Sequence, residues 1–184
     1  LAYHWCERIH TPSSISALPI WAQRTLEEHE DDEREIYSYE TLLRGQTKDE
    51  LWNLCQHALL RNGELHNNLR MTWVKQILRW TQDTQTAIRW SLDFNNRLAL
   101  DGRDPSSYGG ILWGFGLFDR PSSNKDAKPV YGLIRPRSSK DHKNRIDMPG
   151  CREQLLKPSP KSKPRIAIIG AGISGLTAGQ ILHD

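Results

Sequence analysis

Apolar residues recur at spacings of three and four positions along much of this chain. Such spacing is typical of amphipathic helices, and it covers residues 20–31, 39–44, 47–62, 65–81 and 84–97. The helical pattern extends from the first residue to about residue 118, and the alternation that is typical of strands is nearly absent there. We therefore predict that the fold is mainly α-helical.

Local signals mark the ends of some of these helices. Thr47 followed by Glu50 has the spacing of a capping box, which predicts the start of a helix. Gly63 is a suitable C-terminal stop for the same helix. Thr84 is a candidate cap for the next helix, after a break around Asp83.

The composition changes between residues 121 and 164. Pro, Ser, Lys and Arg dominate there, and PSSNKDAKP and KPSPKSKP predict an exposed, extended connector. An apolar island, VYGLI at residues 130–134, is expected to pair or to pack. The basic residues around it fit phosphate contact and a solvated linker equally well (Arg135, Arg137, Lys140, Lys143 and Arg145).

Overall composition sets only broad limits. The 184 residues suffice for one domain or slightly more, and a formal charge of +3 permits contact with a polyanion without predicting it. No apolar run reaches the roughly 20 residues that a membrane span needs. Cys6, Cys55 and Cys151 lack the spacing of metal ligands and favour inert thiols in a reduced compartment, so we expect no metal and a cytoplasmic location. Because both ends resemble helix interiors, we expect a fragment of a longer protein.

Tryptophans and one arginine share a face of the helix at residues 65–81. A period of 100° per residue brings Arg70, Trp73 and Trp80 together with Ile77. Trp73 and Trp80 are two turns apart, roughly 10 Å, a suitable step for electron hopping between indoles. Periodicity alone favours a simple core stripe. A buried guanidinium, however, needs an anionic partner, for which Asp101 and Asp104 are candidates.

Residues 1 to about 147 resemble the C-terminal, FAD-binding helical domain of DNA photolyases, in particular the class II enzymes for cyclobutane pyrimidine dimers. The matching stretches are PIWAQRTLEEHEDD, LWNLCQHALLRNGELHNNLRMTWVKQILRW, LDFNNRLALDGRDPSSYGGILW and FDRP. The resemblance implies light-driven repair, in which reduced FAD donates an electron to a pyrimidine dimer in UV-damaged DNA. We expect a monomer with no membrane contact.

The resemblance also implies how three polar residues surround the flavin. Asn95 matches the asparagine whose side chain faces flavin N5 and tunes the cofactor. Arg70 and Asp101 match a salt-bridged pair beside the isoalloxazine ring, which agrees with the partner expected on grounds of charge.

Further residues match the electron path and the lesion pocket of the family. Trp73, Trp52 and Trp80 match a tryptophan relay that photoreduces the flavin, in that order from flavin to surface. Met71 and Trp113 match residues that line the pocket for the flipped-out dimer, where an extruded base pair needs an apolar stacking surface.

The chain departs from the family pattern at several positions. Thr72 stands where an aromatic residue is usual, and Asp104 to Tyr108 read DPSSY where the family has DPNGY, so a glycine suited to a turn is lost. WGFGLFDRP also differs from the usual sequence. We expect an altered lesion pocket. The resemblance places the antenna domain and the first half of the flavin cage outside this chain, so this piece alone should bind FAD poorly.

A second signature lies at the C-terminal end. Gly170, Gly172 and Gly175 form G-x-G-x-x-G after the apolar run RIAIIG, a context that favours a dinucleotide site over a chance glycine-rich turn. The stretch resembles the FAD-binding motif of amine-oxidase-like oxidoreductases. We therefore predict a helical domain at 1–147, a linker at 148–164 and, at 165–184, the start of a Rossmann-like domain for a second FAD or NAD(P).

Three functions follow from these patterns. The first is an FAD-dependent, light-driven photolyase or a derived photoreceptor, fused to an oxidoreductase. The second is an FAD-dependent oxidoreductase of small molecules with a vestigial photolyase-like region. The third is a helical module that only binds nucleic acid or protein.

Overall fold

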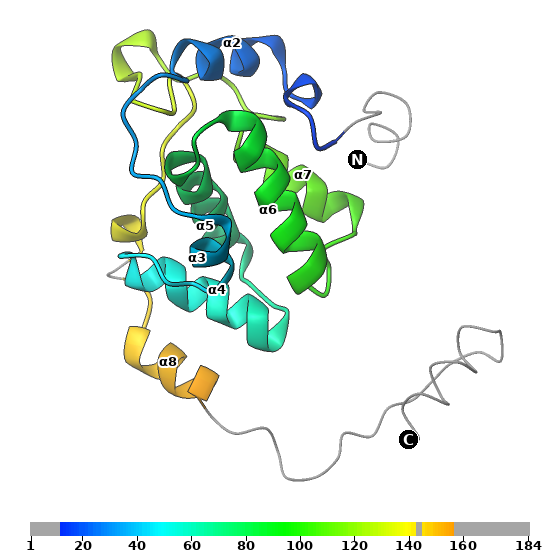
Figure 1. Cartoon of the computed structure of the whole chain (residues 1–184), viewed down its shortest axis with the longest axis vertical. Helices are drawn as coiled ribbons and strands as arrows, with labels where there is room; N and C mark the ends of the chain where they lie inside the picture. Colours follow the sequence, from blue (N-terminus) through cyan, green and yellow to red (C-terminus); the bar gives the residue numbers. More distant parts are fainter. Residues whose placement is uncertain (1–11, 143–144, 157–184) are drawn as a thin grey trace, which may run out of the picture.

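The computed structural model describes residues 12–142 and 145–156, and these residues form a mainly helical fold, as predicted. Figure 1 shows the order of the helices along the chain. They are α2 (Ile20–Glu28), α3 (Tyr39–Leu43), α4 (Glu50–Asn62), α5 (Asn67–Trp80), α6 (Thr84–Leu98), α7 (Pro105–Trp113) and α8 (Met148–Leu156). Short 3-10 turns occur at Ile15–Ala17, Asn124–Asp126 and Ser139–Asp141.

Helix α5 is the centre of the fold. It packs against α4, α6 and α7, and every residue from 70 to 78 is buried. A helix that is covered on all sides must either be apolar throughout or satisfy its polar groups within the protein. Helix α5 does the second, because it carries polar side chains between its core residues. Those polar groups determine the chemistry of the candidate site.

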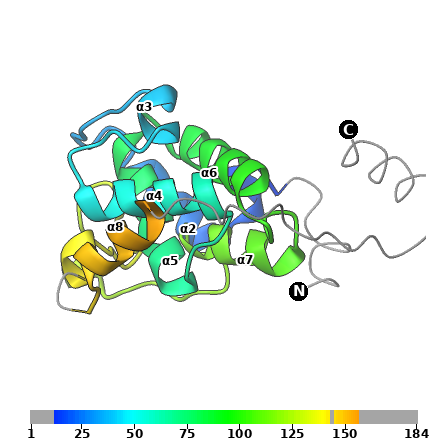
Figure 2. The same cartoon turned by 90° about the horizontal axis from the view of Figure 1, so that it is seen from below.

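Large apolar side chains from the surrounding helices complete the core. They pack around Ile77 and Leu78 of α5 from α3, α4, α6, α7 and the region after α7, and the fully buried ones include Leu42, Trp52, Ile88, Phe94, Ile111, Leu112 and Phe115. Figure 2 shows α8 lying against α4 at the edge of this bundle. Among the described residues, no helix is both long enough and apolar enough to cross a membrane.

The start of α4 differs from the prediction. The helix begins at Glu50, and its cap is Asp49, whose side chain accepts a hydrogen bond from the Trp52 backbone at 3.1 Å. The prediction of a capping box at Thr47 is therefore wrong. Thr47 instead donates to the Asn53 side chain at 2.8 Å and helps fix the loop before the helix.

The other helix ends give one confirmation and one correction. Gly63 ends α4 with φ +69°, a left-handed conformation in which glycine avoids a steric cost. Helix α6 begins at Thr84, but the cap is Asp83, which accepts from the Thr86 backbone at 2.6 Å. The carboxylate reaches the free amide of the first turn, and Thr84 is already inside the helix.

Helix α7 occupies a stretch that we expected to be a turn. Asp104 caps it by accepting from the Ser106 backbone at 2.8 Å, and Pro105 occupies the first helical position, where its missing N–H costs nothing. Ser106 and Ser107 are helical. Because the helix needs no left-handed residue there, the glycine of the usual family sequence is not required.

The segment after residue 121 is more ordered than an extended connector. Val130, Tyr131 and Ile134 are buried, so the apolar island packs as expected. The Tyr131 hydroxyl donates to the backbone oxygen of Lys75 at 3.0 Å and thereby ties this segment to α5. Helix α8 forms within the range that we assigned to the linker, contrary to the extended connector predicted there.

Candidate functional site

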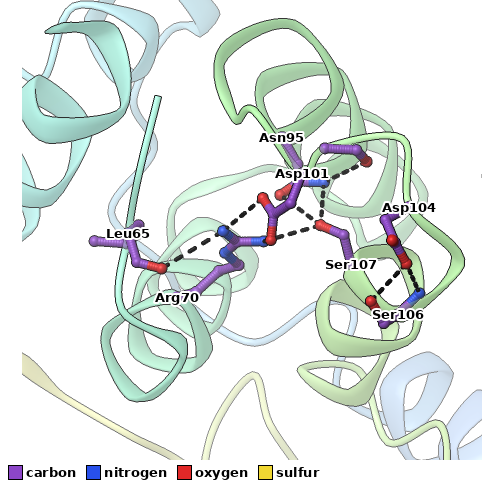
Figure 3. Close-up of polar contacts among 8 residues, drawn as sticks. Leu65, Arg70, Asn95, Asp101, Asp104, Ser106 and Ser107 are labelled. Carbon is purple, nitrogen blue, oxygen red and sulfur yellow. Dashed lines mark hydrogen bonds and ion pairs between the residues drawn. The ribbon is translucent and has the colours of Figure 1, made fainter. Parts of the chain in front are cut away.

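Arg70 and Asp101 form the charged centre of the candidate site, as Figure 3 shows. Arg70 Nη1 donates to Asp101 Oδ2 and Nη2 to Oδ1, both at 2.9 Å, which is the geometry of a bidentate pair. The Arg70 side chain is 8% exposed, whereas that of Asp101 is 56% exposed. The pair therefore links the interior of α5 to the loop after α6 and leaves one carboxylate edge open to solvent or a ligand.

Asp104, the other candidate partner, has a different role. It caps α7, and its hydrogen bonds from the Ser106 side chain and backbone hold the pKa of this carboxyl below its ordinary value. The charge argument was thus right that Arg70 is paired, and the structure selects Asp101.

Ser107 and Asn95 extend the pair into a buried network (Figure 3). Ser107 Oγ accepts from Arg70 Nη1 and from Asn95 Nδ2, each at 2.9 Å. Asn95 Nδ2 also donates to the Gly102 backbone oxygen at 2.9 Å. A Cβ at Gly102 would clash with the Asn95 backbone oxygen, so a glycine lets this loop close over α6. The sequence identified Ser107 only as a departure from the family pattern.

One donor in this network is left over. Arg70 Nε is buried and has no hydrogen-bond partner among the described residues. An unsatisfied buried donor costs free energy, more so on a charged group, and such atoms often mark a site that a ligand completes.

Trp73, Trp52 and Trp80 form a continuous group of indoles. Trp52 of α4 stacks on Trp73 with ring centroids 6.2 Å apart and an interplanar angle of 5°. Its ring also meets Trp80 edge to face at 5.4 Å and 81°. Within α5, Trp73 and Trp80 are two turns apart, and Trp52 contacts both of them.

Hydrogen bonds fix two of the three indoles. Trp52 Nε1 donates to the Trp73 backbone oxygen at 3.0 Å, and Trp73 Nε1 donates to Gln56 Oε1 at 2.9 Å. Trp73 also meets Phe94 at 6.3 Å, and Phe94 precedes Asn95 on α6. The indole group therefore begins one residue away from the polar network.

Trp80, which the expected order places at the surface end of the indole group, is less exposed than that order implied. Trp80 is only 5% exposed, and its ring packs edge to face with Tyr37 at 5.3 Å. It lines a cavity of about 440 Å³ together with Tyr37 and Arg79.

Met71 and Trp113, the predicted lesion residues, lie on α5 and at the end of α7. Met71 is buried, and its Cε lies beside Gly110 of α7, where a Cβ would make an ordinary contact at 3.6 Å. Trp113 is half-buried, and Lys75 Nζ lies 5.0 Å from its ring centroid. The guanidinium carbon of Arg137 lies 5.8 Å from the same centroid.

Lys75 is a buried cation that the sequence did not suggest. Its side chain is fully buried, and Nζ donates to the Arg135 backbone oxygen at 2.7 Å. Burial lowers the pKa of Lys75 to about 8. The available signal was a lysine between two tryptophans on an otherwise internal helix. Its contact with a residue 60 positions away could not be inferred from it.

A cavity of about 670 Å³ adjoins the charged pair. Arg70 and Asp101 line one part of it, and α4, α8 and the loop before α5 line the rest, whereas Asn95 and Trp73 do not reach it. Cys55 and Cys151 also line this cavity, and burial raises the pKa of the Cys55 thiol to about 12. A thiol with so high a pKa is largely protonated at neutral pH. No metal-binding cluster of His, Cys, Asp or Glu occurs in the part of the chain that the structure describes.

Comparison with known proteins agrees with this arrangement. No family model matches the chain. It is 41% identical over 124 residues to the deoxyribodipyrimidine photo-lyase of Methanothermobacter thermautotrophicus, covering 67% of this chain. It is 34% identical over 169 residues, or 91% of this chain, to the enzyme of that name from Oryza sativa, and 42% identical over 117 residues, or 62% of this chain, to that from Arabidopsis thaliana. The chain is a member of the photolyase superfamily.

The chain spans about a quarter to a third of the length of these relatives. The chain covers 27%, 33% and 23% of the three photolyases. Members of the superfamily generally bind FAD. The predicted glycines of the dinucleotide motif, Gly170, Gly172 and Gly175, lie outside the residues that the structure describes, as do Cys6 and Lys143.

Proposed function

We propose that this chain is part of an FAD-dependent photolyase that splits cyclobutane pyrimidine dimers in UV-damaged DNA with light. The observation that supports this proposal most is that the charged pair and the indole group lie close together around helix α5. Helix α5 carries Arg70 and two of the three indoles, and these residues meet Asp101 of the loop after α6 and Trp52 of α4. Charge, hydrogen bonding and an aromatic path of this kind are what a protein needs to bind a flavin and to move single electrons to it.

Arg70, Asp101 and Asn95 would hold the flavin. FAD in its reduced, light-excited form supplies the electron that splits the dimer. The buried Arg70 Nε fits this role, because it is a donor for which a carbonyl or ring nitrogen of the flavin is a natural acceptor. Asn95 Oδ1 receives only a long contact of 3.3 Å from Ser107, so it retains acceptor capacity for a flavin N–H.

Trp73, Trp52 and Trp80 would reduce the flavin in steps. Successive ring centroids are 6.2 and 5.4 Å apart, which leaves no gap in the aromatic path. The indole N–H groups of Trp52 and Trp73 are already bonded within the protein, so both rings are held in fixed orientations. In this proposal electrons move inward to the flavin, and the electron hole that they leave moves outward through Trp80 toward Tyr37 and the adjoining cavity.

Met71 and Trp113 would receive the dimer after it flips out of the duplex. Both present large, soft apolar surfaces, which replace the stacking that the base pair loses. Trp113 is the more accessible of the two. We also retain the proposed division into a helical domain at 1–147, a linker at 148–164 and a dinucleotide-binding segment at 165–184, with a second FAD or NAD(P) as its expected cofactor.

Photoreduction tests the relay. Under blue light and an external electron donor, the full-length protein that contains this chain should reduce its bound flavin, and Trp73→Phe should abolish this while flavin absorbance shows that FAD remains bound. Trp90→Phe is the matched control, because Trp90 packs on Tyr39 and not on the three indoles. Equal photoreduction in Trp73→Phe and wild type would refute the relay.

Repair tests the function as a whole. The protein should split thymine dimers in an oligonucleotide under light and not in darkness. Neither an oxidoreductase of small molecules nor a module that only binds nucleic acid would do so. Flavin reduction without dimer splitting would favour a derived photoreceptor, and dark turnover of an amine would favour the oxidoreductase.

A further inference from the structure

A second polar cavity, of about 620 Å³, lies between the residues at the start of α5 and residues 137–142 and 145–146. Two arginines and two histidines line it, with one carboxylate (Arg137, Arg145, His66, His142 and Asp141). The N-terminal end of α5, which carries partial positive charge, adds to this basic character. Neither the flavin network nor the indole group uses this cavity.

The single carboxylate is already engaged. Asp141 Oδ2 accepts from the Ser138 backbone at 2.8 Å and from the Ser138 hydroxyl at 3.2 Å, closing a capping box over a 3-10 turn. Within the described ranges, no ion pair joins Arg137 or Arg145 to an acidic side chain. The cavity therefore has an excess of positive charge.

The arginine charges contribute to the lowered pKa of His142. Burial lowers the pKa of His142 most, and the charges of Arg137 and Arg145 lower it further, while Asp141 opposes them. Burial first, and repulsion by the two arginines second, favour a neutral imidazole in this position. An anion in the cavity would reverse that repulsion.

Hydrogen bonds from α5 hold the walls of the cavity in place. The Arg137 backbone oxygen accepts from Gln76 Nε2 at 2.7 Å, and the Thr72 hydroxyl bonds to His142 Nε2 at 2.7 Å. Thr72 stands where the family usually has an aromatic residue, and here its hydroxyl makes the second bond. Arg137 also lies over Trp113, so one guanidinium borders both the cavity and the predicted lesion residue.

We propose that this cavity binds a backbone phosphodiester of the DNA strand that carries the lesion, with Arg137 and Arg145 as its charged donors. The inference rests on the proposed function and adds a positioning site to it. Guanidinium groups donate to phosphate oxygens in pairs, and such contacts fix register without reading sequence. Arg137 would thereby couple the position of the strand to the position of Trp113.

A DNA-binding assay measures how much this cavity contributes to DNA affinity. Fluorescence anisotropy with a thymine-dimer duplex, over a series of salt concentrations, compares wild type with the double variant Arg137→Gln/Arg145→Gln. We expect affinity to fall roughly tenfold per arginine and the dependence of log Kd on log salt to become shallower by about 1 to 2. Arg24→Gln/Arg89→Gln removes the same charge from α2 and α6, outside the cavity, and is the matched control.

The outcomes separate this inference from the proposed function. A wild-type protein that neither prefers nor repairs dimer-containing DNA refutes the proposed function. A protein that repairs dimers, but whose double variant keeps the affinity and salt dependence of the control, refutes the phosphate site alone. Preference for damaged over undamaged DNA should be retained in the double variant, because phosphate contacts carry no lesion information.

Dimethyl phosphate provides a second measurement that needs neither flavin nor light. This diester anion should raise the pKa of His142 in NMR titrations of the whole chain at constant ionic strength, and His142→Gln identifies the resonance. Arg137→Gln/Arg145→Gln should abolish the change. Binding of dimethyl phosphate without any loss of DNA affinity in the double variant would assign the cavity to a small phosphate ligand and overturn the inference.

Discussion

Replacing Lys75 by methionine tests how the centre of the fold tolerates charge. The ammonium is fully buried in α5, donates to the Arg135 backbone oxygen and lies 5.0 Å from the Trp113 ring centroid. Burial is the main cause that lowers its pKa to about 8, the charge of Asp119 raises it, and Arg137 and Arg135 lower it. The protein therefore holds a cation that folding makes more acidic.

The size of the effect follows from the two pKa values. In the unfolded chain Lys75 has its ordinary pKa of 10.5, so between pH 8 and 10.5 the unfolded state binds more protons than the folded state. Stability consequently rises with pH over this window, and below pH 8 the full cost of the buried charge is present. Two and a half pKa units, at about 1.4 kcal/mol each, give roughly 3 kcal/mol in total. About 1.4 kcal/mol of this should be regained by pH 9.

Urea denaturation at pH 7 and pH 9 measures this difference. Wild type should gain about 1.4 kcal/mol relative to Lys75→Met between the two pH values. At pH 7 the variant loses a charge-assisted hydrogen bond, worth about 1.5–3 kcal/mol, but also the buried charge, so the two proteins should differ little in stability. Lys140→Met, at an exposed position, keeps Lys75, so its stability should change with pH in parallel with that of wild type. Parallel pH profiles for wild type and Lys75→Met would refute the reasoning.

Three further substitutions test the local structure, each by the free energy of unfolding in urea. Ser107→Ala should cost about 1–2 kcal/mol by removing the hydroxyl that joins two buried donors, and a change within error would mean that water replaces it. Gly63→Ala should cost about 1–2 kcal/mol, because its φ is positive and a Cβ would meet Leu100 Cγ at 2.8 Å. Asp83→Ala should cost about 1 kcal/mol as the loss of a helix cap, whereas Thr84→Ala should change little; the reverse order would restore Thr84 as the cap.

The helices with a clear apolar stripe were predictable, and the exceptions have physical causes. Helix α7 has glycines at 109 and 110 and begins with Asp-Pro, so its sequence reads as a turn, yet packing against α5 and α6 stabilises it. Helix α8 contains Pro149 and Gly150, and its contact with α4 overrides their weak helix propensity. Propensity describes the isolated segment, and tertiary packing decided both cases.

The candidate site was predictable only as far as single elements determine it. That Arg70 is paired followed from the cost of an unpaired buried charge, which holds in any fold, but this argument left both Asp101 and Asp104 as partners. The position of Trp52 against Trp73 depends on the register between α4 and α5, which periodicity within one helix does not contain. The bond between Thr72 and His142 joins residues 70 positions apart, and nothing local signals it.

The three central indoles have a consequence for how this protein can change over time. Trp52, Trp73 and Trp80 fill the middle of the core, so replacing any of them by a small residue would open a cavity at a cost of about 3–5 kcal/mol. Selection for a stable fold alone would therefore preserve them. A descendant that no longer used light would therefore keep its tryptophans, because packing alone requires them.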